Sequence, residues 1–72
     1  MLKRGDVCKL NTRFYREKTV GKLSGVTEYT YLLLEDPAMT ETPGIIKCLV
    51  ICSETKQHIG VVKLIYLEKK YE

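Results

Sequence analysis

Hydrophobic and polar side chains alternate most regularly between residues 28 and 35. One set consists of Tyr29, Tyr31 and Leu33, and the interleaved set consists of Thr30, Leu32 and Leu34. Successive side chains of a β-strand point to opposite faces, so a period of two residues is typical of a strand. We therefore predict a strand over Glu28–Glu35.

Four other segments have the composition of strands and are bounded by turn-forming residues. They are Val7–Leu10, Lys22–Ser24, Ile45–Ser53 and Ile59–Lys63. The nearly unbroken apolar run of Ile45–Ser53 predicts a central strand that is buried on both faces. The polar residues Glu54–His58 predict a hairpin loop, so that Ile59–Lys63 returns as the antiparallel partner of that strand.

Turn-forming residues mark the connections between these strands. Gly5 and Asp6 predict a turn into the first strand, and both prolines fall in the long loop Asp36–Gly44. The last stretch, Leu64–Tyr71, fits two structures. The spacing of its leucines fits one face of a helix, whereas Tyr66 and its neighbour fit a short final strand.

Five strands with short connections in 72 residues indicate one domain, residues 1–72. Closing a small sheet into a barrel removes the exposed edges that would otherwise pair with other chains. The expected fold class is therefore all-β, a small five-stranded antiparallel barrel with room for a short helical turn near the C-terminal end.

The opening segment Lys3–Leu10 (KRGDVCKL), the glycine-punctuated strands after it and the final Tyr66–Glu68 resemble the small Src-homology-3-like barrels of bacteria and their viruses. In that superfamily a Gly-Asp turn opens the first strand and a one-turn helix precedes the last. The resemblance implies this fold. It implies no particular activity, because such barrels bind nucleic acids, peptides, nucleotides and other proteins.

The charged side chains are distributed unevenly along the chain. Residues 1–22 contain seven basic and two acidic side chains, residues 23–45 contain four acidic and no basic ones, and residues 46–72 contain five basic and three acidic ones, which gives the net charge of +3. This layout predicts one surface that attracts phosphates or acidic partners and another that repels them.

The cysteines and the apolar runs indicate a cytoplasmic protein. Cys8, Cys48 and Cys52 lack the two-residue spacing of zinc and redox motifs, so we predict three reduced core residues in a reducing compartment. The apolar runs are far shorter than the roughly 20 residues that span a bilayer, and no secretion signal precedes them. We expect no contact with a membrane.

The candidate binding site is the segment from Arg13 to Lys18, in which two aromatic residues are interleaved with three cations. We predict that Arg13, Arg16 and Lys18 bind phosphates and that Phe14 or Tyr15 stacks on a base. Lys9 and Lys22 would extend this basic face, and Lys3 and Arg4 lie near its start. The alternative is a solvated loop in which Phe14 packs into the fold.

The remaining polar residues do not form a pattern that predicts catalysis. His58 is interpreted as a surface residue, and Glu35 with Asp36 as loop residues, because adjacent side chains of a strand point apart. No phosphate loop, zinc-hydrolase motif or dinucleotide fingerprint is present. We expect no enzyme, no metal and no cofactor.

These interpretations lead to a small binding module. The first hypothesis is a protein that binds nucleic acid or a nucleotide through the basic and aromatic segment. The alternative is a protein-interaction module that uses the acidic loop Glu35–Gly44 and exposed tyrosines, for example a phage-encoded inhibitor or accessory protein that acts on a host protein. The number of tyrosines and the apolar excess also predict a homodimer or a larger oligomer.

Overall fold

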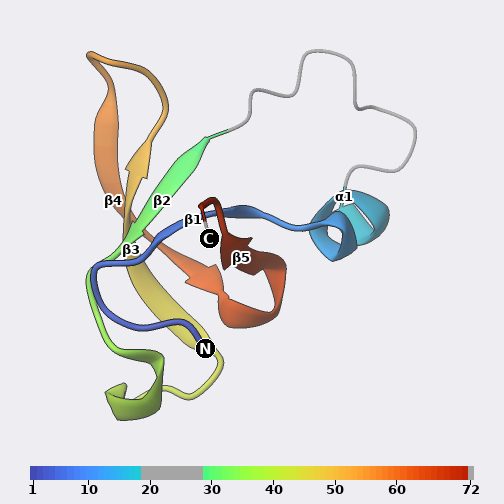
Figure 1. Ribbon diagram of the computed structural model, residues 1–72, viewed down its shortest axis with the longest axis vertical. Helices are drawn as coiled ribbons and strands as arrows, with labels where there is room; N and C mark the ends of the chain where they lie inside the picture. The colour runs from blue at the N-terminus through green and yellow to red at the C-terminus, as the bar shows by residue number, and fades with distance from the viewer. Residues whose placement is uncertain (19–28, 72) are drawn as a thin grey trace.

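The computed structural model describes residues 1–18 and 29–71. Its five strands form one antiparallel sheet in the order β4-β3-β2-β1-β5 (Figure 1). The strands are β1 (Val7–Leu10), β2 (Thr30–Leu33), β3 (Ile45–Ile51), β4 (Gln57–Lys63) and β5 (Leu67–Lys69). Within these described ranges, helical structure is limited to α1 (Thr12–Lys18) and the 3₁₀ turns η1 (Pro37–Met39) and η2 (Leu64–Tyr66). The expectation of a mostly β fold with five antiparallel strands is confirmed.

The strand boundaries differ from the sequence-based ones at several places, since β2 ends at Leu33 and not at Glu35, and β3 ends at Ile51 and not at Ser53. Gln57 and His58 belong to β4 and not to the predicted hairpin loop. The stretch Leu64–Tyr71, which fitted either a helix or a short final strand, contains one helical turn, η2, followed directly by the strand β5. The predicted strand Lys22–Ser24 lies outside the residues that the structure describes.

The hydrophobic core lies on one face of the sheet, which we call the inner face. Its buried cluster consists of Cys8, Tyr31, Leu33, Ile46, Cys48, Val50 and Leu67. Leu10 and Val62 are partly buried and pack against this cluster. The alternation predicted for Glu28–Glu35 is therefore correct where the structure describes it, because Tyr31 and Leu33 point into the core and Leu32 does not.

The prediction that β3 is buried on both faces is wrong. Ile46, Cys48 and Val50 are buried, whereas Ile45 and Lys47 are exposed. We call this second face of the sheet the outer face. An unbroken apolar run hides the period of two, and even Leu49 and Ile51 on this face are only partly buried.

Two glycines with positive φ shape the loops around the sheet. Gly5 has a φ of 90° in the turn before β1, where the main-chain N–H of Lys3 donates to the Asp6 carboxylate (2.9 Å). Gly44 has a φ of 86° directly before β3. Residues with a side chain rarely adopt this region of φ, so both turns need glycine.

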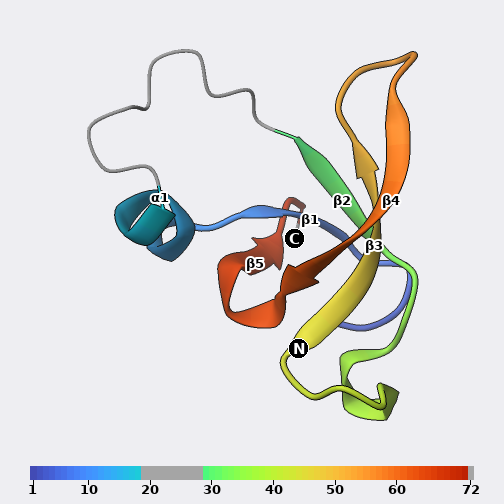
Figure 2. The same ribbon diagram turned by 180° about the vertical axis from the view of Figure 1, so that it is seen from behind.

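The sheet ends at β4 on one side and at β5 on the other. Figure 2 shows the same arrangement from behind, with α1 and β4 on opposite sides of the molecule. The turn between β3 and β4 lies at the end of the molecule opposite η1 (Figures 1 and 2). In the ranges 1–18 and 29–71, no helix has the length and hydrophobicity that crossing a membrane requires.

The three cysteines are free thiols, but they do not share one environment. Cys8 and Cys48 are fully buried. Burial raises the pKa of Cys48 to about 11, and electrostatic interactions with Cys8 and Glu35 act in the same direction. Burial also raises the pKa of Cys8. Cys52 follows the end of β3 and is only partly buried, but it packs against the buried cluster, so its prediction as a core residue is correct only in part.

We expect this difference to separate the thiols in a labelling experiment. The thiolate is the reactive form, and Cys8 and Cys48 are both inaccessible and hard to deprotonate. An aromatic disulfide reagent at pH 8 should label one thiol of the native protein rapidly and the other two only after unfolding in urea. A Cys52→Ser variant should lose the rapid phase. Rapid labelling of two thiols in the native protein would contradict this assignment.

Candidate binding surfaces

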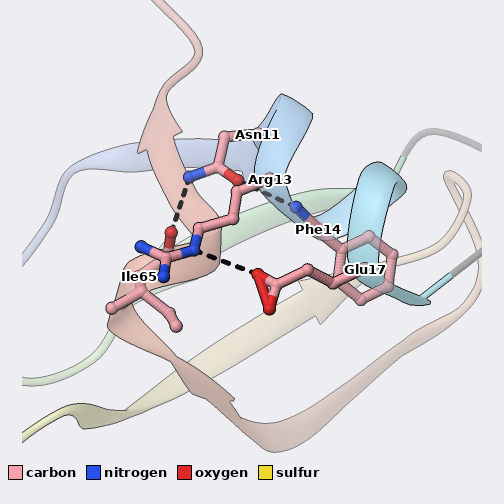
Figure 3. Close-up of polar contacts among 5 residues, drawn as sticks. All are labelled: Asn11, Arg13, Phe14, Glu17 and Ile65. Atoms are coloured by element: carbon pink, nitrogen blue, oxygen red, sulfur yellow. Dashed lines mark hydrogen bonds and ion pairs between the residues drawn. The ribbon is translucent and has the colours of Figure 1, made fainter.

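The predicted binding segment forms a short helix, α1, and Asn11 is the residue that positions it. Its Oδ1 accepts a hydrogen bond from the main-chain N–H of Phe14 (3.1 Å), as a helix N-cap does. Its Nδ2 donates to the carbonyl of Ile65 (2.7 Å), and its main-chain N–H donates to the carbonyl of Tyr66 (2.8 Å). Asn11 therefore starts the helix and fixes it to η2 (Figure 3).

The aromatic residues of α1 pack against the protein. The Phe14 ring is partly buried and meets the rings of Tyr66 and Tyr15 edge to face, with centroids 5.5 Å apart in both pairs. Tyr15 is also partly buried. The inward packing of Phe14 agrees with the alternative interpretation of this segment, although the segment is a helix and not a loop.

The cations of this segment differ in how they are engaged. Nε of Arg13 forms an ion pair with the Glu17 carboxylate one helical turn away (3.0 Å), as Figure 3 shows. Arg16 is exposed on the same helix. Lys9 lies on β1 with its partner Glu68 directly opposite on β5. Lys18 ends the helix, and Lys22 lies outside the described residues. The structure therefore brings Arg13 and Arg16 together and gives Arg13 and Lys9 acidic neighbours.

A hollow of about 420 Å³ lies on the outer face, between the loop that contains η1 and the strands β3 and β4. Its lining consists of Glu35, Met39, Thr40, Glu41, Thr42, Ile45, Lys47 and Val61. This volume falls within the range of about 300–1,000 Å³ that is typical of ligand pockets. Most of the lining comes from the acidic loop that the alternative hypothesis singled out.

Several apolar side chains in this hollow and elsewhere on the outer face are open to solvent. Met39 is 82% exposed, Val61 is 68% exposed and Ile59 is 66% exposed. Leu49 lies directly opposite Ile59 in the ladder between β3 and β4, and Leu32 lies opposite Leu49 on β2. An apolar row therefore crosses the outer face from β2 to β4.

The charges at the hollow are mostly acidic. Oε1 of Glu35 accepts a hydrogen bond from the main-chain N–H of Lys47 (3.2 Å), which ties the start of the loop to β3. Oδ1 of Asp36 accepts from the N–H of Ala38 (2.9 Å) and caps η1. Glu41 is exposed and has no ion pair with the part of the chain that the structure describes. Glu35 and Asp36 thus shape the loop, and Glu41 remains available to a ligand.

Cys52 and His58 approach each other across the turn between β3 and β4. Sγ of Cys52 lies 3.9 Å from Nδ1 of His58, which is a weak contact, and His58 is exposed. A nucleophilic Cys-His pair would also need a third group to orient the ring and donors for an oxyanion. The described residues place no carboxylate on the ring and form no cluster of metal ligands.

Two features of the sequence indicate α1, although the predictions above include no helix there. Asn is among the preferred N-cap residues, and Arg13 and Glu17 have the spacing of a helical ion pair. The hollow had no comparable signal, because it forms where the η1 loop meets residues of β3 and β4. Comparisons of the chain with protein-family models, with curated proteins and with solved structures found no match.

Proposed function

We propose that this protein is a protein-interaction module that binds a segment of its partner in the hollow on the outer face. The observation that carries this proposal is the exposure of Met39 and Val61 at the rim of a hollow of about 420 Å³. Contiguous exposed apolar residues with a polar rim are typical of interaction sites. Four of the lining side chains belong to the loop 36–44, so loop and sheet together form the site.

The charges of the hollow define the chemistry of the segment that it binds. Glu41 is exposed and free of ion pairs with the described residues, and Glu35 is a second acidic residue of the lining. An apolar side chain would pack on Met39, Ile45 and Val61, and a neighbouring Lys or Arg would pair with Glu41. The proposed ligand is therefore an extended segment with an apolar residue next to a basic one.

The layout of the chain also supports the inference of a Src-homology-3-like fold. The glycine turn that opens β1 and the 3₁₀ turn directly before β5 are the two features that the resemblance in the sequence implied. Barrels of this kind bind many classes of ligand, so the fold does not choose between functions. The choice between the candidate functions therefore depends on the hollow and the exposed apolar residues of the outer face.

Binding of nucleic acid or a nucleotide through α1 is the second candidate. It is supported by the exposure of Arg16 and Arg13 on one side of a short helix. Against it, Arg13 is paired with Glu17, and the rings of Phe14 and Tyr15 are partly buried. A base would have to displace intramolecular contacts before it could stack on either ring. We therefore place this function behind the first.

Selection of peptides from a displayed random library tests the first proposal. Recovered peptides should share an apolar residue next to Lys or Arg. In fluorescence polarisation, a Met39→Lys variant should bind such a peptide roughly tenfold more weakly or worse, because it loses apolar contact area and adds a like charge. Glu41→Lys should weaken binding in the same direction.

Ile65→Lys is the matched control, since Ile65 is also an exposed apolar residue but lies on η2 outside the hollow. It should bind the peptide as the wild type does, and circular dichroism should show that all variants are folded. Equal binding by Met39→Lys and the wild type would refute the hollow as the site. Salt-sensitive binding of oligonucleotides that is lost on replacing Arg13 and Arg16 by Ala, without any peptide binding, would support the second candidate instead.

A further inference from the structure

Strand β4 is a long sheet edge that is not covered by any of the described residues. It has seven residues, and two of its side chains, Ile59 and Val61, are exposed and apolar. The other end of the sheet, β5, has only three residues, and Glu68 and Lys69 on it are exposed. Short, charged edges resist pairing with another chain, whereas long apolar edges promote it. The two ends of this sheet therefore differ in their tendency to bind a further strand.

The hydrogen-bond pattern shows which backbone groups of β4 are available. At one end of the hairpin, the N–H of Cys52 donates to the carbonyl of Lys56 (2.9 Å), and at the other the N–H of Leu64 donates to the carbonyl of Gly44 (2.8 Å). Antiparallel ladders alternate between bonded and non-bonded pairs. The even-numbered residues of β4 therefore bond to β3. The odd-numbered ones, Gln57, Ile59, Val61 and Lys63, direct their N–H and C=O groups away from the sheet.

We propose that β4 pairs antiparallel with β4 of a second copy of this chain, with the twofold axis at Gly60. In this register Ile59 lies opposite Val61 of the other copy, twice, and Gln57 lies opposite Lys63. The outward-facing backbone groups of these residues then bond to one another. Gly60 faces its own copy in a non-bonded pair, where strands approach most closely, and it has no side chain to separate them.

The chemistry of β4 favours a second copy as the occupant of this edge. Self-pairing about Gly60 opposes no like charges, because the only formally charged side chain of β4, Lys63, faces an amide. It also places the exposed Ile59 and Val61 of the two copies side by side, while the outer face on which they lie stays open. Pairing of β4 with β5 of another copy would use only three residues of β5 and would oppose charged side chains to this apolar edge. The isologous arrangement is thus the better fit.

Light scattering coupled to size-exclusion chromatography tests the proposal on the protein alone. The wild type should have twice the 8.3 kDa mass of the monomer at high concentration and should dissociate on dilution. In Ile59→Pro the ring removes an N–H that points away from β3, so the hairpin keeps its own bonds and the intermolecular bond is lost. We expect the dissociation constant of the dimer to rise roughly tenfold or more, with circular dichroism unchanged.

Disulfide trapping tests the register without relying on that variant. In a Cys52→Ser background, Gly60→Cys should form a disulfide-linked dimer on mild oxidation, because the Cα atoms of a non-bonded pair are about 4.5 Å apart. A side chain there meets only ordinary contacts with Val50 and His58. Ile59→Cys is the matched control and should not cross-link, since its opposite residue is Val61. The proposal would be overturned if the wild type stays monomeric at millimolar concentration or forms an oligomer larger than a dimer. Equal cross-linking of the two cysteine variants would also overturn it.

Discussion

Replacing Leu33 by Ala is expected to lower the free energy of unfolding by about 2–5 kcal/mol, the range measured for leucines whose loss leaves a cavity. Leu33 is 1% exposed and belongs to the buried cluster on the inner face. A domain of 72 residues has a total stability of about 4–11 kcal/mol on typical values per residue. The variant should therefore have a substantial unfolded fraction, visible as a lower urea midpoint in circular dichroism.

Leu34→Ala is the control that the chain itself offers. Leu34 is the next residue, is only partly buried and lies outside the buried cluster. The same change of side chain should cost about 1 kcal/mol there, because less apolar surface is removed from contact. If both variants lost the same free energy of unfolding, Leu33 would not be more deeply buried than Leu34, which would contradict the structure.

Replacing Asn11 by Ala is expected to lower the free energy of unfolding by about 1–3 kcal/mol. The variant loses the cap on Phe14 and the hydrogen bond from Nδ2 to the carbonyl of Ile65. The first contact caps α1 and the second holds it on η2, so the amide of Phe14 should also exchange faster with solvent. Urea unfolding gives the first quantity, and amide hydrogen exchange by NMR gives the second.

Two further variants separate the roles of Asn11. Asn11→Asp keeps an oxygen that accepts from Phe14 but loses the donor to Ile65, so its stability should fall between those of the wild type and the Ala variant. Arg13→Ala removes only an exposed ion pair on the same helix and should cost about 0.5 kcal/mol or less. If Asn11→Ala were no more destabilising than Arg13→Ala, Asn11 would not be the residue that positions α1.

The sequence was sufficient for those elements in which local pattern and tertiary context agree. The period of two around Tyr31, the turn at Gly5 and the loop between the prolines each follow from the preferences of single residues, and all three occur in the structure. The exposure of one face of β3 could not be read in the same way. An apolar run is compatible with one or two covered faces, and only the position of the other elements decides between them.

The candidate site shows the same division. Arg13 and Arg16 could be predicted as candidates because the sequence alone shows cations next to aromatic residues. The ion pair of Arg13 could not be predicted in the same way, since it depends on Glu17 and on the formation of a helix. The hollow involves Met39 and Val61, which are distant in the chain and meet only after β3 and β4 have formed. A surface that is formed jointly by a loop and by strands distant in the chain therefore cannot be predicted from a sequence motif.

The order of the strands has a consequence for how the chain folds. The hairpin of β3 and β4 closes a loop of five residues, whereas the pairing of β1 with β5 joins residues near the two ends of the chain. Chain entropy makes the second closure costlier by about 2 kcal/mol. On a ribosome the synthesised chain therefore keeps the β1 edge open until residue 69 has emerged. Until then, the unpaired edge of β1 can pair with another chain, so slower synthesis leaves more time for aggregation.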